Sequence, residues 1–114
     1  MLTIENLRLY GADVEEGLSR CFQNEAFYLK LVGMLKQDTG FEKLEKAIRE
    51  NDLDAAFEAA HALKVVLGNL SLTPAYHKVN EITELLRTRT QMDYSELLAG
   101  ILEQKALLEE LLAE

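Results

Sequence analysis

The segment HALKVVLGNLSL, from His61 to Leu72, carries the most informative pattern in the chain. We place it on an α-helix at about 100° per residue, together with the residues just before it. Its apolar residues then form one broad stripe, which is typical of a helix packed against a core. The stripe consists of Ala56, Ala59, Ala60, Leu63, Val66, Leu67 and Leu70. His61 falls on the opposite side, so we expect this helix to expose its histidine.

The expected surroundings of His61 mix charged and apolar side chains. Asp54, Phe57, Glu58, Lys64, Val65 and Gly68 all fall within about 60° of it. Lys64 shares the histidine's surface because side chains three residues apart on a helix are neighbours. Phe57 and Val65 would leave apolar surface around the imidazole, which indicates a docking site centred on His61. The alternative is an ordinary polar surface histidine.

Length and composition predict a single globular domain over residues 1–114, large enough to bury its own core. The net charge of −8 argues against nucleic acid as a partner, because binding to phosphates requires a basic face. No apolar run approaches the ~20 residues of a membrane span, and the lone Cys21 excludes an internal disulfide. We therefore expect a cytoplasmic protein with no membrane contact.

The pattern of elements predicts an all-α fold. Asp13 with Glu16 resembles a capping box for a first full helix over 13–22, after a short turn at 4–9. Further helices are expected at 24–37, 41–50, 51–70, 73 to 87 or 90, and 93–113, with a break at 38–40. Thr73 is expected to be the N-cap of the helix that follows it. Four long helices joined by short loops predict an antiparallel up-down four-helix bundle. We expect the bundle at about 24–113, with an additional N-terminal helix lying across it.

Other kinds of site find little support in the sequence. His77 and His61 lack a Cys or carboxylate cluster at ligand spacing, so no metal site is predicted. No glycine-rich phosphate loop is present, so the chain has no recognised ATP site and is expected to need no cofactor. These observations argue against a kinase and against an enzyme with its own substrate.

The stretch AAHALKVVLGNLSLTPAY resembles the signature of the histidine-containing phosphotransfer (HPt) domains, which typically reads AHxLKGxAGNxG. The residues that match in register are Ala60, His61, Leu63, Lys64, Gly68 and Asn69. The resemblance implies a phosphoryl carrier in a two-component phosphorelay. His61 would accept the phosphoryl group on Nε2 from a receiver-domain aspartate and pass it to another, and Lys64 would stabilise the phosphoryl oxygens. The implied partners are response-regulator receiver domains and a hybrid sensor histidine kinase.

The same resemblance suggests which residues would dock a receiver. Phe57, Val65 and Gly68 would surround the imidazole, and Thr83 stands where relatives often carry a polar residue near it. Gly68 would leave room for another backbone to approach closely, or would serve helix packing. Exposed apolar residues such as Phe27 or Met34 would extend this docking surface.

The chain departs from the family pattern at Val65, where the family usually has glycine one turn from the histidine. Leu67 and Ser71 also replace smaller residues. The added valine side chain lies within about 5–6 Å of the histidine Cβ and would narrow access to it. Two other functions therefore remain open. One is a degenerate HPt-like module that docks a receiver or kinase without phosphotransfer, and the other is a structural helical bundle.

Overall fold

A computed structural model describes residues 1–113 of the chain, and these residues form helices joined by short turns. The helices are α1 (Ile4–Tyr10), α2 (Val14–Arg20), α3 (Glu25–Gly33), α4 (Gly40–Arg49), α5 (Leu53–Asn69), α6 (Thr73–Arg87) and α7 (Ser95–Leu112), with the 3-10 turn η1 (Met34–Gln37) between α3 and α4. Within residues 1–113 there is no strand, so the predicted all-α class is confirmed.

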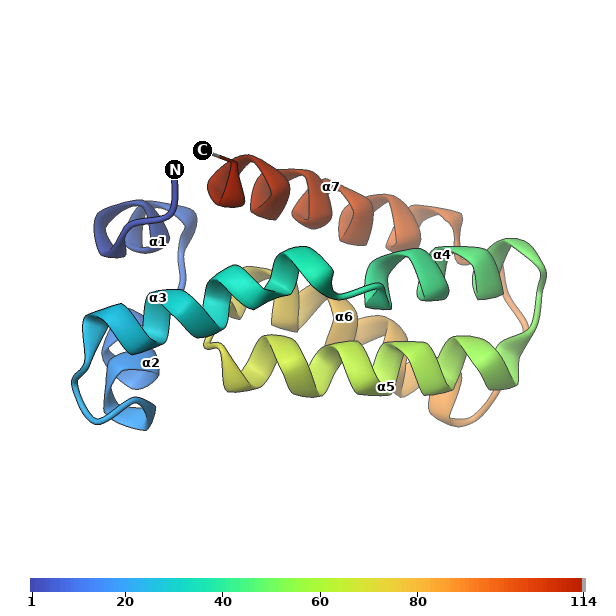
Figure 1. The fold of residues 1–114 in the computed structure, drawn as a ribbon. Helices are drawn as coiled ribbons and strands as arrows, with labels where there is room; N and C mark the ends of the chain where they lie inside the picture. Colours follow the sequence, from blue (N-terminus) through green and yellow to red (C-terminus); the bar gives the residue numbers. More distant parts are fainter. Residues whose placement is uncertain (114) are drawn as a thin grey trace.

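Helices α4, α5, α6 and α7 form the bundle. Each packs on the next, and α7 returns to pack on α4, which closes the ring of four. Figure 1 shows that successive helices run in opposite directions, with α3 extending the line of α4 beyond the break. The predicted antiparallel up-down four-helix bundle is therefore confirmed.

The predicted break at 38–40 separates η1 from α4. Asp38 has an extended backbone, and its Oδ1 accepts a hydrogen bond from Gly40 N at 2.7 Å. A Cβ on Gly40 would lie 3.0 Å from Leu63 Cδ1. Because Gly40 has no side chain, the first residues of α4 can lie directly against the middle of α5.

The N-terminal segment forms two short helices, α1 at the turn predicted at 4–9 and α2 within the helix predicted at 13–22. Tyr10, at the end of α1, donates its hydroxyl to Gln104 Oε1 on α7 at 2.8 Å. The same hydroxyl accepts a hydrogen bond from Ala75 N, at 3.1 Å, in the first turn of α6. Tyr28 on α3 donates its hydroxyl to the Leu70 carbonyl at 2.8 Å. Burial raises the pKa of both phenols to about 12, and these two side chains join the N-terminal helices to the bundle.

The core is apolar and continuous from α1 to α7. Helix α5 contributes Ala56, Ala60, Leu63 and Leu67 to it, in agreement with the predicted stripe, while Ala59, Val66 and Leu70 are only partly buried.

The N-cap of α6 lies one residue earlier than predicted. Leu72 is the N-cap, Thr73 is already helical, and the Thr73 hydroxyl donates to the Ser71 carbonyl at 3.4 Å instead of capping. The physical reason is that the Tyr10 hydroxyl already accepts the Ala75 N–H that a capping side chain would satisfy.

Candidate functional site

His61 lies near the middle of α5 and is exposed, as predicted. The helix is fixed at its start by Asp52, whose side chain accepts a hydrogen bond from Ala55 N at 3.1 Å. The alanine-rich stretch that follows has high helix propensity and small side chains that pack closely. The histidine is therefore presented to solvent on a helix whose other face is anchored in the core.

Phe57 lies one turn before His61, with the two ring centroids 5.7 Å apart. Two guanidinium groups cover its ring, one from the last residue of α6 and one from the turn that follows it. The Cζ of Arg87 lies 5.3 Å from the ring centroid and that of Arg89 lies 4.7 Å from it. Phe57 is partly buried as a result, whereas Val65, one turn after His61, is 47% exposed. The apolar rim predicted around the imidazole is present, but on the Phe57 side it is capped by cations.

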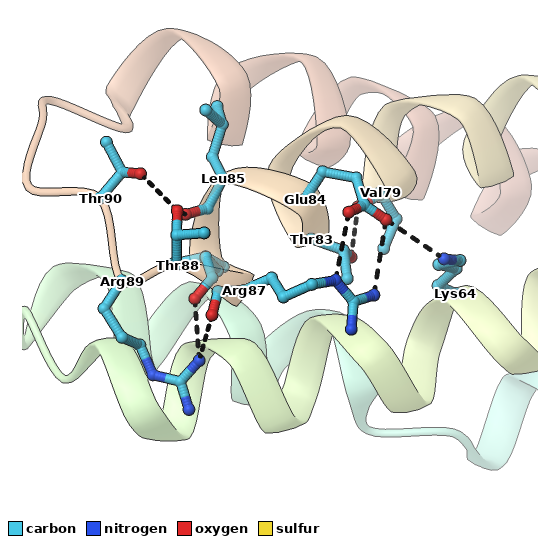
Figure 2. Close-up of polar contacts among 10 residues, drawn as sticks. Lys64, Val79, Thr83, Glu84, Leu85, Arg87, Thr88, Arg89 and Thr90 are labelled. Atoms are coloured by element: carbon cyan, nitrogen blue, oxygen red, sulfur yellow. Dashed lines mark hydrogen bonds and ion pairs between the residues drawn. The ribbon is translucent and has the colours of Figure 1, made fainter.

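Lys64 is half-buried and lies between α5 and α6. Its Nζ is 3.7 Å from Glu84 Oε1, with 21% of the lysine side chain exposed. Arg87 donates to the same carboxylate through Nε at 3.1 Å and Nη2 at 3.4 Å. Hydrogen bonding and charge from Arg87, with a smaller contribution from Lys64, lower the pKa of Glu84. Figure 2 shows this chain of contacts, with the Glu84 carboxylate between the two cations.

Gly68 is partly buried, and a Cβ at this position would crowd the side chain of Tyr76. A Cβ there would lie 3.1 Å from Tyr76 Cε1 on α6. The structure therefore favours the packing interpretation of Gly68 over an opening for a partner's backbone.

Thr83 is fully buried, so the prediction that it belongs to the docking surface is wrong. Its hydroxyl donates to the Val79 carbonyl one turn earlier in α6, at 2.6 Å. The reason is the packing of α6, which turns the face with Val79, Ile82, Thr83 and Leu86 into the bundle. In Figure 2 the Thr83 side chain is seen bonded within α6.

The charged residues that complete the site come from the end of α6 and were not singled out from the sequence. Glu84, Arg87 and Arg89 each contact Lys64, Phe57 or Asp54 on α5. A signal for them existed, because α5 and α6 form an antiparallel pair that turns at Leu72. Phe57 and Arg87 stand at equal distances from this turn along the chain, which places them opposite each other.

The family model of the Hpt domain matches residues 33–114 of this chain. The chain belongs to the Hpt domain family. The match covers most of the chain, including all of α4, α5 and α6, and it confirms the resemblance drawn from the His61 segment. No curated protein and no solved structure matches the chain significantly. Membership implies a part in histidine phosphotransfer within two-component phosphorelays, in which Hpt domains carry phosphoryl groups and have no ATP site of their own.

Two further observations concern other kinds of site in residues 1–113. No group of three or more His, Cys, Asp or Glu side chains is arranged to hold a metal ion in this part of the chain. None of its helices combines the length and the apolar character that a membrane span requires.

Proposed function

We propose that this Hpt domain accepts a phosphoryl group on His61 from the aspartyl phosphate of one response-regulator receiver domain and passes it to another. The exposure of His61 on α5, beside the cation Lys64, is the observation that carries the proposal. Phosphoryl transfer needs positioning and charge neutralisation more than it needs a complex set of catalytic groups. A histidine with one neighbouring lysine meets that need when the receiver supplies the rest.

The proposed step is a direct displacement at phosphorus. The lone pair of His61 Nε2 attacks the phosphorus atom while the bond from phosphorus to the aspartate oxygen breaks. The carboxylate leaves with the bonding electron pair, and the proton on Nδ1 stays on the ring or passes to solvent. The reverse displacement, by the carboxylate of a second receiver, restores the free histidine. No nucleotide takes part, and any metal ion in the complex belongs to the receiver.

The remaining residues would act in docking and charge neutralisation. Lys64 stands three residues after His61, so its ammonium can meet the phosphoryl oxygens. Phe57 and Val65 border the imidazole on either side along α5. The apolar surface of Val65, and the part of Phe57 that Arg87 and Arg89 leave exposed, would contact the receiver around its aspartate. Gly68 would contribute indirectly, because it lets Tyr76 lie close against α5.

Docking without transfer is the second candidate function, and Val65 is the observation that favours it. This residue is 47% exposed, one turn from His61. The branched side chain would meet an approaching receiver before the imidazole does. A receiver or kinase would then bind the Hpt domain without bringing its phosphoryl group to His61.

A reconstituted relay tests the two functions against each other. Phosphorylated receiver domains are mixed with the Hpt domain, and the label is followed to it and then to a second receiver. The proposal predicts acid-labile label on the Hpt domain and onward transfer, with faster transfer for Val65→Gly if the valine restricts access. Detectable binding without label on the wild type, with label appearing on Val65→Gly, would support docking alone.

A further inference from the structure

The contacts of Lys64 show that its charge is already engaged in the unphosphorylated protein. Its Nζ lies 3.7 Å from Glu84 Oε1, which is close enough for an ion pair but too long for a good hydrogen bond. The Glu84 side chain is 53% exposed, so solvent screens this pair. Lys64 is thus held weakly by a carboxylate from the neighbouring helix.

The Glu84 carboxylate has a second and stronger partner. Arg87 donates two hydrogen bonds to it, and the Arg87 guanidinium also packs on the ring of Phe57. These contacts keep the carboxylate at the edge of α6 that faces α5. If Lys64 moved away, Glu84 would remain paired with Arg87, so neither charge would be left without a partner.

We propose that Glu84 is a positioning residue that competes with the phosphoryl group for Lys64 and thereby sets how firmly the Hpt domain retains that group. The inference rests on the proposed function of His61 and deepens it. A phosphoryl group carries about two negative charges, so it attracts the lysine more strongly than one carboxylate does. Lys64 then moves from Glu84 to the phosphoryl oxygens, while Arg87 holds Glu84 in place.

This competition affects how firmly the site retains the phosphoryl group. Every phosphorylation of His61 requires the Lys64–Glu84 pair to open, and every departure of the phosphoryl group allows the pair to form again. Glu84 therefore lowers the affinity of the site for the phosphoryl group without touching it. A carrier that both accepts and donates benefits from such a balance, because retention that is too strong would stop onward transfer.

The test compares Glu84→Gln with the wild type in two measurements. The first is the equilibrium distribution of phosphoryl groups between the Hpt domain and one receiver. The second is the hydrolysis rate of the purified phosphorylated Hpt domain, which involves no docking. We expect Glu84→Gln to shift the equilibrium toward the Hpt domain by about two- to fivefold, the range expected for an exposed ion pair. The shift should shrink at high salt, because salt screens exposed charges.

A double-mutant comparison separates action through Lys64 from a general change in charge or packing. In the Lys64→Met background, Glu84→Gln should leave the equilibrium and the hydrolysis rate nearly unchanged. Glu103→Gln, an exposed position on α7, removes the same charge away from the site and should behave as the wild type.

Two results would overturn the inference, and they are distinguishable from failure of the proposed function. One is a wild type that takes up label while Glu84→Gln leaves both measurements unchanged. The other is a full Glu84→Gln effect that persists without Lys64. A wild type that never takes up label would contradict the proposed function itself, and this inference with it.

Discussion

The guanidinium of Arg89 lies over the ring of Phe57, with its Cζ 4.7 Å from the ring centroid. Arg89 Nε also donates to Asp54 Oδ1 at 2.6 Å, and its Nη1 donates to the Leu86 and Arg87 carbonyls at 3.0 and 3.1 Å. One side chain therefore closes the end of α6 and connects it to the start of α5. These contacts compensate for a backbone φ of 53° at Arg89, a conformation that favours glycine.

We expect Arg89→Gln to lower the free energy of unfolding by about 1–2 kcal/mol, because it removes the cation–π contact and the charged hydrogen bonds together. Urea denaturation of the two proteins measures this difference. Arg49→Gln is the matched control. Within residues 1–113, Arg49 pairs only with Glu45 on its own helix, so its loss should cost no more than about 0.5 kcal/mol. Equal losses for the two variants would show that Arg89 does not connect the helices.

We expect alanine to change the stability of the protein in opposite directions at two helical glycines. A Cβ on Gly17 would lie 2.4 Å from Tyr28 Cζ, and the Tyr28 ring is buried and hydrogen-bonded to Leu70. Gly17→Ala should therefore destabilise the protein by about 1–3 kcal/mol through overpacking. A Cβ on Gly100 would meet only the flexible Lys78 side chain, at 3.6 Å. Gly100→Ala should stabilise the protein by up to about 1 kcal/mol through helix propensity. Thermal unfolding of both variants checks the sign of each change in stability. A Gly17→Ala protein as stable as the wild type would contradict the close packing of Gly17 against Tyr28.

Thr83→Val tests the buried placement of Thr83. Valine has nearly the same shape as threonine, and the hydrogen bond that is lost with the hydroxyl lies within α6. We expect the free energy of unfolding to change by less than about 1 kcal/mol. Phosphoryl transfer should be unchanged, because the side chain lies away from the imidazole's surface. A large loss of transfer with the fold intact would place Thr83 in the site after all.

The Tyr10 phenol predicts a pH dependence on the alkaline side. Its pKa is raised to about 12 in the folded protein, from an ordinary value near 10, because the side chain is partly buried. The folded state thus holds the proton more firmly, and the resulting stability is present below pH about 10 and lost as the pH rises toward about 12. We expect the stability difference between the wild type and Tyr10→Phe to narrow over this range. Urea midpoints at several alkaline pH values measure it, and a constant difference would contradict the expectation.

The elements of the fold and the exposure of His61 could be predicted because both depend on local pattern. The apolar stripe of α5, the Asp13 cap and the break at 38–40 each depend on residues that lie a few positions apart. The rim of Phe57 and Val65 followed from the same helical spacing.

The burial of Thr83, the contact of Gly68 and the Lys64–Glu84 pair could not be predicted, because they depend on how neighbouring helices align. Thr83 lies at the edge of the buried stripe of α6, where spacing alone allows either side, and only the packing of that helix into the bundle places it inside. Gly68 likewise faces Tyr76, which stands at the same distance from the Leu72 turn. The Lys64–Glu84 pair further required two long side chains to meet across the helices.

The most direct measurement of the central claim is the position of the acid-labile label, since the chain contains two histidines. His61→Ala and His77→Ala are treated with the same phosphorylated receiver as the wild type. Because both histidines are exposed, each variant should retain the wild-type stability to within about 0.5 kcal/mol. We predict that His77→Ala takes up label as the wild type does and that His61→Ala takes up none. Label that persists in His61→Ala, or that is lost in His77→Ala with the fold intact, would contradict the assignment of His61 as the phosphoryl acceptor.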